Sequence, residues 1–304
     1  MRLFQPIHAG YVRLTTALLL AGLLSGCGSV PAAESAAHSP VLLPMYTPSP
    51  SPTAVPSPIQ TASPDMVFEE DGDLYFSDAF AATFAARVFP FDHAPRVLIY
   101  HTHTREAFAD TAQQATPAPD GTRARAENTD AEKNVVYLGT VLADALRERG
   151  FVVFHDETDN EPPALSTAYE RSRTVMAQYE DIDLFIDLHR NMSNARNAVN
   201  DVVTLDNTRM ARLFFVVGTG IVMGDTSGET ENWLENYTLA LSLTERLNRL
   251  DAGLARPIRV KQRVYNQDMG LSLLVEIGHN GNRLADAAHT IPALADALKD
   301  VCTF

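Results

Sequence analysis

From residue 96 onward the chain alternates short apolar runs with segments whose apolar residues recur at spacings of three and four. A short apolar run between polar turns is typical of a strand that is buried on both faces, and the three/four spacing is typical of a helix with one buried face. The expected strands are 96–100, 151–154, 184–188, 213–217 and 273–277, and the expected helices are 134–149, 169–179, 233–250 and 291–301. This alternation predicts an α/β domain with a single, mostly parallel sheet and helices on both faces.

The N-terminal residues 1–27 have the pattern of an export signal. Arg2 and Arg13 carry positive charge, and the apolar run that ends at Leu24 is shorter than the roughly 20 residues that a membrane-spanning helix needs. The run leads into Leu24-Ser25-Gly26-Cys27, which resembles a bacterial lipobox. We therefore expect cleavage before Cys27, lipid attachment to that cysteine and an extracytoplasmic, membrane-anchored lipoprotein. An ordinary signal peptide with an incidental cysteine is the alternative.

A proline-rich stretch separates the signal from the rest of the chain. Nine of the 18 prolines fall between residues 31 and 65, mixed with Ser, Thr and Ala. Proline fixes φ and removes a backbone donor, so this stretch cannot build a helix or a sheet. We expect residues 28–65 to form a semi-stiff tether. We expect a lead-in segment over 66–95 and the main folded domain over 96–304.

Charge and cysteine content exclude several classes of protein. The chain has 24 Lys and Arg against 38 Asp and Glu, a net charge of −14. A surface of this sign repels phosphates, so no nucleic-acid partner is expected. Two cysteines cannot build a disulfide scaffold or a Cys-rich zinc module. Any bound metal must therefore be held by histidine and carboxylate side chains.

Ionisable side chains stand at the ends of three expected strands. His101 and His103 follow the first strand, His189 follows the strand 184–188, and Glu276 lies near the end of the strand 273–277. The carboxyl ends of parallel strands share one edge of a sheet, so these residues are expected to meet in space. A mononuclear zinc hydrolase needs three nitrogen or oxygen ligands, an open position and a carboxylate base. Two histidines and one further carboxylate as ligands, with Glu276 as the base, would fit that requirement.

The residues alone leave the third ligand open. Glu132 precedes the expected helix 134–149, where it also suits the helix dipole, and Glu106 lies three residues beyond His103. One of His101 and His103 is expected to bind the metal and the other to support it. Arg190, directly after His189, is a candidate for binding a substrate carboxylate or for pairing with a neighbouring acid.

Six segments, in the same order along the chain, together resemble one known family. They are Ile99–Glu106, Glu132–Val136, Asp187–Arg190, Phe215–Thr219, Asn266–Asp268 and Leu274–Asn282. The family is that of the sporulation stage II protein P, which is similar in fold to the zinc-dependent N-acetylmuramoyl-L-alanine amidases of cell walls. The resemblance runs from about residue 95 to residue 301.

The resemblance implies a peptidoglycan hydrolase that uses Zn2+ to cut stem peptides from glycan strands, with cleavage of peptide cross-links as a second activity. It implies action during engulfment in a sporulating cell, alongside the sporulation stage II protein D. His103, His189 and Glu132 fall on the zinc ligands of wall amidases, and Glu276 falls on their catalytic glutamate. Those amidases have a Gly-rich turn where this chain has Thr104-Arg105-Glu106, so Glu106 stays an alternative ligand. The lipobox is a second departure, because the family is expected to carry a transmembrane anchor.

A protein of another class also fits these observations. It is a non-catalytic, membrane-tethered lipoprotein that binds the cell wall or a partner through the same fold. Metal content and chelator-sensitive cleavage of sacculi separate it from the hydrolase. A serine hydrolase is not favoured, because the sequence has no Gly-x-Ser-x-Gly elbow.

Overall fold

An eight-stranded sheet, in the order β1-β2-β12-β11-β13-β8-β4-β7, organises the computed structural model. The structure describes residues 66–68, 73–117, 124–192, 201–222 and 226–304. The strands are β1 Met66–Phe68, β2 Asp73–Phe76, β4 Arg96–Tyr100, β7 Val152–His155, β8 Leu184–Asn191, β11 Leu213–Gly218, β12 Arg259–Lys261 and β13 Ser272–His279. The predicted signal peptide, the lipid-attachment residue Cys27 and the tether lie outside the described residues. In the described part of the chain, no helix combines the length and apolar character needed to cross a membrane.

The four strands at one end of the sheet, β13, β8, β4 and β7, all run parallel to their neighbours. The direction reverses at β11, which is antiparallel to β13 and parallel to β12. The lead-in strands β1 and β2 complete the other edge, where β2 pairs with β12. The predicted α/β fold with a mostly parallel sheet is confirmed, and the reversal at β11 is the feature that the apolar pattern did not reveal.

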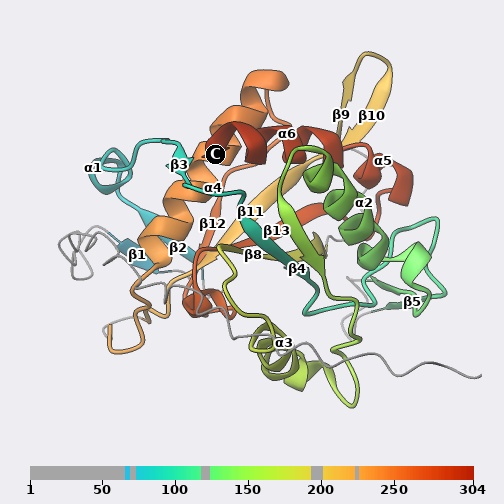
Figure 1. Ribbon diagram of the computed structural model, residues 1–304. Coiled ribbons are helices and arrows are strands. Elements are labelled where there is room, and N and C mark those ends of the chain that lie inside the picture. Colours follow the sequence, from blue (N-terminus) through green and yellow to red (C-terminus); the bar gives the residue numbers. More distant parts are fainter. Residues whose placement is uncertain (1–65, 69–72, 118–123, 193–200, 223–225) are drawn as a thin grey trace, which may run out of the picture. The chain divides into compact units, whose positions relative to one another are not determined.

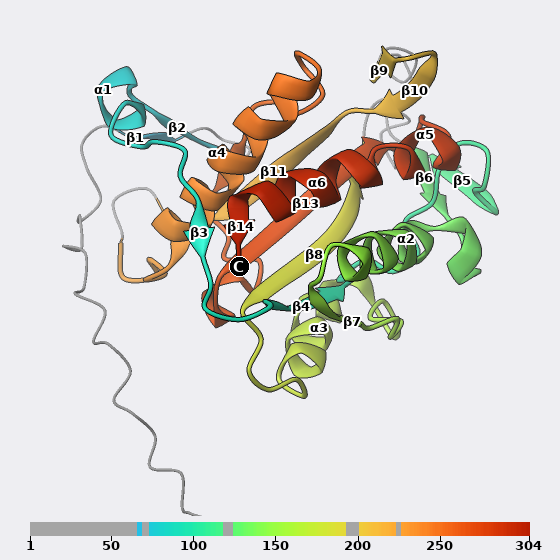
Figure 2. The same ribbon diagram turned by 45° about the horizontal axis from the view of Figure 1, so that its top comes forward.

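Three long helices cover one face of the sheet, and one shorter helix covers part of the other (Figures 1 and 2). The first group is α2 Val135–Glu148, α4 Trp233–Leu250 and α6 Ile291–Val301, whose leucines share one core with strand residues such as Ile99, Ile186 and Val275. On the other face, Met176 of α3 (Ala168–Met176) packs against Leu98, Tyr100 and Phe185. Successive strand residues point to opposite faces, which explains the two separate cores.

Helix α2 shows how the sequence specifies one of these elements. Its residues 135, 138, 142 and 146 are all fully buried, at the three/four spacing of a helix with one apolar face. The side chain of Asn134 caps the start by accepting a hydrogen bond from the backbone N–H of Val136 at 2.8 Å. Gly150 follows the end of the helix with a φ of +90°, a conformation that favours glycine.

Several short elements surround the sheet, and they are too short to show a periodic pattern in the sequence. The two-stranded pairs are β3 Phe89–Pro90 with β14 Cys302–Thr303, β5 Gln114–Pro117 with β6 Ala124–Glu127, and β9 Val202–Leu205 with β10 Thr208–Ala211. The helices α1 Asp78–Ala81 and α5 Leu284–Ala288 are also short. In the lead-in segment, the rings of Phe76, Phe80 and Phe84 pack together with Trp233 and Tyr237 of α4.

His189 and Glu276, two of the residues predicted to carry chemistry, lie on the face opposite α2, α4 and α6, whereas His101 faces α2. His189 of β8 stands beside Glu276 of β13 in the parallel register, and Tyr100 of β4 stands beside Asp187 of β8. The neighbouring positions 186, 188, 275 and 277 belong to the helix-covered core. Strand alternation thus separates an apolar face that stabilises the fold from a polar face that carries the site.

A substitution in α2 tests how tightly this helix packs against the strands. Alanine normally stabilises a helix by about 1 kcal/mol relative to glycine. At Gly139, however, a Cβ atom would lie less than 3.0 Å from the Nε2 atoms of both His155 and His101. We therefore expect Gly139→Ala to lower the free energy of unfolding by about 1–3 kcal/mol in urea titrations. The matched substitution Thr140→Ala, on the exposed side of α2, should change it by less than about 0.5 kcal/mol. A stabilised Gly139→Ala protein would contradict this packing.

Candidate metal centre

The loop that follows β4 brings its side chains over the ends of β8 and β13. Thr102 anchors the loop through its backbone N–H, which donates to Oδ1 of Asp187 at 2.9 Å, and through its hydroxyl, which donates to Oδ2 at 2.7 Å. Further along, the hydroxyl of Thr104 donates to Asp159, and the backbone N–H of Ala107 donates to the carbonyl of Ala126. The loop is therefore held at both ends, with residues 103 and 106 over the sheet.

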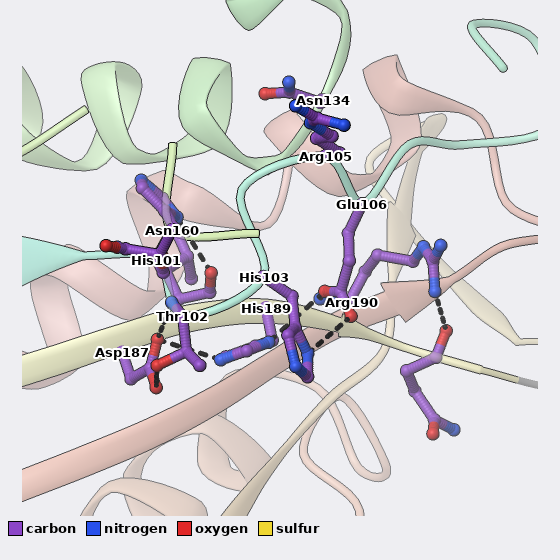
Figure 3. A network of polar contacts seen from close by, with 12 residues as sticks. His101, Thr102, His103, Arg105, Glu106, Asn134, Asn160, Asp187, His189 and Arg190 are labelled. Atoms are coloured by element: carbon purple, nitrogen blue, oxygen red, sulfur yellow. Dashed lines mark hydrogen bonds and ion pairs between the residues drawn. The ribbon is translucent and has the colours of Figure 1, made fainter. Parts of the chain in front are cut away.

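His103, Glu106 and His189 converge at this edge, as Figure 3 shows. One donor atom from each residue lies within 4.8 Å of the donor atoms of the other two. Nδ1 of His103 is 3.5 Å from Oε1 of Glu106, and Nδ1 of His189 is 3.3 Å from Oε2. Two imidazoles and one carboxylate are a donor set that suits Zn2+. The geometry of this cluster fits a metal ion with three protein ligands.

Asp187 orients His189 from the side away from Glu106. Its Oδ1 atom lies 2.8 Å from Nε2 of His189, and the whole carboxylate is buried. A carboxylate behind a ligating histidine fixes the ring and raises its basicity. Asp187 therefore does two things, because it holds His189 and also anchors the loop through Thr102.

The charges in the cluster depend on each other. Burial alone would lower the pKa of His189, but the carboxylates of Asp187 and Glu106 overcome that effect and hold the pKa well above its usual value. Burial would likewise raise the pKa of Glu106, and here the positive charges of His189 and Arg190 hold the pKa well below its usual value. The metal-free cluster thus contains a protonated imidazole between two ionised carboxylates.

Glu276 differs from these carboxylates. It is partly buried on β13 beside His189, and its Oε2 atom is buried without a hydrogen-bond partner among the described residues. Burial raises the pKa of Glu276 to about 7, and the nearby negative charge of Glu106 adds to the rise. A carboxyl group with a pKa near neutrality can both accept and donate a proton, which is the property of a general acid–base group.

His101 lies behind the cluster. It is fully buried, with Nδ1 at 2.9 Å from the carbonyl oxygen of Leu188 and Nε2 at 2.9 Å from Nε2 of His155. Burial lowers the pKa of His101 to about 3, and the neighbouring His155 contributes to the shift. Both ring nitrogens of this neutral histidine are occupied. Of the two histidines that follow β4, His103 is therefore the one with a donor atom in the cluster.

Arg190, the other residue predicted near the site, is buried and makes backbone contacts. Its Nε atom donates to the carbonyl of Ala107 at 2.8 Å and an Nη atom donates to the carbonyl of Ala126 at 2.7 Å. Its own backbone N–H donates to Oε2 of Glu106 at 2.9 Å. Arg190 thus ties the loop to β6 and positions Glu106. In this structure its guanidinium is engaged by backbone carbonyls.

The structure separates the two candidates for the third ligand. Glu132 lies on the 3-10 turn Ala131–Lys133, where its side chain is exposed and its backbone N–H is capped by Asp130. It does not belong to the cluster of donor atoms, whereas Glu106 does. A ligand must lie beside the ion that the histidines hold, so the geometry favours the alternative Glu106 over the first choice, Glu132.

No role for Asp187 was predicted from the sequence. A signal was present, because an aspartate inside an apolar strand and two residues before His189 must share a face with that histidine. A buried carboxylate in such a strand needs a partner, and here the partners are His189 and Thr102.

Comparison with known proteins finds a matching sequence family and several similar solved chains. The family Stage II sporulation protein P (SpoIIP) matches residues 82–299. One solved structure is the CwlD amidase from Clostridioides difficile in complex with the GerS lipoprotein, at 12% identity and a TM-score of 0.38. Another is the catalytic domain of the CD27L endolysin, which targets Clostridia difficile, at 16% identity and a TM-score of 0.41. Each alignment covers 67% of this chain and 94% of the other. No curated protein matches the chain.

The raised pKa of Glu276 predicts how stability changes with pH in chelator-treated, metal-free protein. In the unfolded chain this carboxyl group ionises near 4.5, and in the folded chain it ionises at about 7. The folded state therefore binds more protons between these values, and stability should fall as pH rises through them. Relative to Glu276→Gln, the wild type should lose up to about 3 kcal/mol of unfolding free energy between pH 4.5 and 7. A difference that stays constant across this range in urea titrations would contradict the assigned pKa.

Proposed function

The chain belongs to the Stage II sporulation protein P family, and we propose that it is a peptidoglycan hydrolase, a Zn2+-dependent N-acetylmuramoyl-L-alanine amidase. The observation that carries the proposal is the convergence of His103, Glu106 and His189 beside Glu276, at the ends of three parallel strands. Such a site combines metal ligands with a separate carboxyl group that can transfer protons.

In this proposal the metal is held by His103, His189 and Glu106. Bound Zn2+ would supply Lewis acidity toward a carbonyl oxygen and would lower the pKa of water, which is the chemistry that amide hydrolysis requires. The donor set supports zinc, because imidazole and carboxylate are ligands that Zn2+ prefers and no thiolate is needed. Asp187 supports the assignment further by bracing His189 from behind.

Glu276 has the role of general acid and base. It would accept the proton of the attacking water as the bond to the amide carbon forms, and it would then give that proton to the leaving nitrogen of L-alanine. The pKa of about 7 supports both steps at neutral pH. Arg190 contributes by position, because its backbone N–H and its charge keep Glu106 ionised.

The setting of the reaction is also part of the proposal. We infer an extracytoplasmic enzyme, anchored through lipid on Cys27, that acts on peptidoglycan during engulfment together with the sporulation stage II protein D. Cleavage of peptide cross-links is a second activity. The net charge of −14 does not favour electrostatic binding to anionic wall polymers. A tether would compensate by raising the local concentration of enzyme at its substrate.

Zinc binding distinguishes the two candidate ligands. We expect the full chain to bind about one Zn2+ ion, because the cluster can hold a single ion. Glu106→Gln and His189→Ala should weaken zinc binding by roughly 100-fold or more in competition with a chromophoric chelator, whereas Glu132→Gln should leave it unchanged. Loss of zinc from Glu132→Gln with retention in Glu106→Gln would reverse the assignment. A wild-type protein that binds no zinc and cuts no sacculi would favour the alternative, a non-catalytic wall-binding lipoprotein.

Activity separates Glu276 from the ligands. Because Glu276 transfers protons in this scheme, Glu276→Gln should retain zinc but lose about 10²- to 10⁴-fold in the rate of peptide release from muropeptides. Peptide release measured by chromatography, with zinc content measured on the same samples, tests this. Full activity in Glu276→Gln would reject the scheme.

A further inference from the structure

An aromatic ledge, formed by Tyr169 and Tyr265, lies beside the metal centre. The ring of Tyr169 is 5.7 Å from the ring of His103, and the rings of Tyr169 and Tyr265 are 5.6 Å apart. Tyr265 also packs against the cluster of Phe214, Val216 and Leu274, and Phe214 stands directly across from Glu276 in the antiparallel register of β11 and β13. The ledge therefore adjoins both the metal-ligand side and the Glu276 side of the site.

An exposed arginine lies on this ledge. Cζ of Arg263 is 4.1 Å from the centre of the Tyr169 ring and 5.4 Å from that of Tyr265, which is the geometry of a cation–π contact. Within the described part of the chain, no carboxylate pairs with Arg263 and no hydrogen bond engages its guanidinium. The cation is thus held by its two rings and keeps its five N–H donors free.

The loop that carries Arg263 and Tyr265 is rigidly fixed. Tyr265 and Asn266 have φ values of +55° and +59°, a left-handed conformation that asparagine tolerates but that is costly for tyrosine. The Asn266 side chain donates to the carbonyl of Tyr169 at 2.8 Å, which ties the loop to α3. The Gln267 side chain bonds to β11 through the N–H of Gly218 and the carbonyl of Val216.

Gly218 explains why the loop can lie so close to the sheet. A Cβ atom at this position would collide with the backbone oxygens of Arg263 and Val264. The segment Asn266–Asp268, which the sequence analysis singled out, thus serves to hold Arg263 in place, and the metal centre does not use it. Backbone strain that surrounding contacts maintain is typical of segments that present a functional side chain.

These observations lead to an assignment of substrate contact, which rests on the proposed function. We propose that Arg263 binds the carboxylate of the second residue of the stem peptide. In that peptide the L-alanine at the scissile bond is followed by D-isoglutamate, whose α-carboxylate is free, or by isoglutamine, in which it is an amide. The His103 ring lies 5.7 Å and Cζ of Arg263 lies 4.1 Å from the centre of the Tyr169 ring, so the two are at most about 10 Å apart. Two residues of extended peptide span about 7 Å and a hydrogen bond adds about 3 Å, so the carboxylate of the second residue can reach the guanidinium.

The chemistry of the guanidinium favours a carboxylate over an amide. A planar guanidinium with free donors can hold a carboxylate through two parallel charge-assisted hydrogen bonds, which an amide cannot match. The same cation would not suit an ammonium group or an apolar side chain. In a chain with a net charge of −14, a fixed and unpaired arginine beside the site also gives a local attraction for an acidic peptide.

Kinetics on two matched substrates test the assignment. The full, zinc-loaded chain would be given disaccharide peptides that differ only in D-isoglutamate or D-isoglutamine at the second position. Arg263→Gln should lower kcat/KM on the acid substrate about 10-fold or more, mainly by raising KM. It should change kcat/KM on the amide substrate by less than about 3-fold. Arg263→Lys should give an intermediate kcat/KM on the acid substrate, because lysine keeps the positive charge but cannot form the two parallel hydrogen bonds.

Two further arginines serve as controls. Arg249 lies on α4, on the helix-covered side, where it pairs with Glu245, so Arg249→Gln should behave as wild type on both substrates. Arg259, whose Cζ is 5.5 Å from the Phe214 ring, is the nearer comparison, and Arg259→Gln should have a smaller effect than Arg263→Gln. The proposal is overturned if Arg263→Gln lowers kcat/KM equally on both substrates or changes it on neither. It is also overturned if Arg259→Gln lowers kcat/KM on the acid substrate more than Arg263→Gln does.

Binding of the product peptide separates this proposal from the proposed function. L-alanyl-D-isoglutamate should bind the wild-type protein more tightly than L-alanyl-D-isoglutamine in calorimetric titrations, and Arg263→Gln should remove the difference. This readout needs no catalysis, so it remains decisive if the wild type releases no peptide from any muropeptide. Equal affinities of the two dipeptides for the wild type would overturn the role of Arg263 even if the amidase activity is found.

Discussion

His189 stands buried between two carboxylates, and the rest of the site depends on this arrangement. Asp187 lies behind the ring and Glu106 lies in front of it, so that the imidazole stays charged in the metal-free protein despite its burial. Removing one partner of such a buried group is costly, of the order of 3–5 kcal/mol, because the remaining charge has no compensation. The same two carboxylates also anchor the loop after β4, since Asp187 accepts two hydrogen bonds from Thr102 and Glu106 accepts one from Arg190.

The sheet makes this arrangement possible by giving its two faces different tasks. On one face α2, α4 and α6 bury the apolar side chains, and on the other the same strands present Asp187, His189 and Glu276. The shared direction of β4, β8 and β13 brings the three strand ends to one edge. The reversal at β11 then sets Phe214 opposite Glu276, and Tyr265 packs against the cluster that Phe214 forms with Val216 and Leu274. The candidate metal centre and the aromatic ledge are in this way parts of one polar face.

Much of the fold followed from periodicity, because long apolar patterns reflect burial directly. The helices 135–148, 233–250 and 291–301 begin and end within a residue of the expected positions. The meeting of His103, His189 and Glu276 also followed, since parallel strand ends must converge. The choice between Glu106 and Glu132 did not, because it depends on how the loop after β4 turns over the sheet. Short elements such as the β9–β10 hairpin, and the strained backbone of Tyr265, are held by tertiary contacts that leave no local pattern in the sequence.

The proposed function requires one divalent ion bound where the loop after β4 meets β8. It can be tested with a crystal structure of the full chain grown with Zn2+ and an anomalous difference map recorded at the zinc absorption edge. We expect a single strong peak within coordination distance of His103, Glu106 and His189, with Glu276 next to it and not bonded to it. A peak beside Glu132, or a zinc-soaked crystal with no peak between the two histidines, would rule out this metal site.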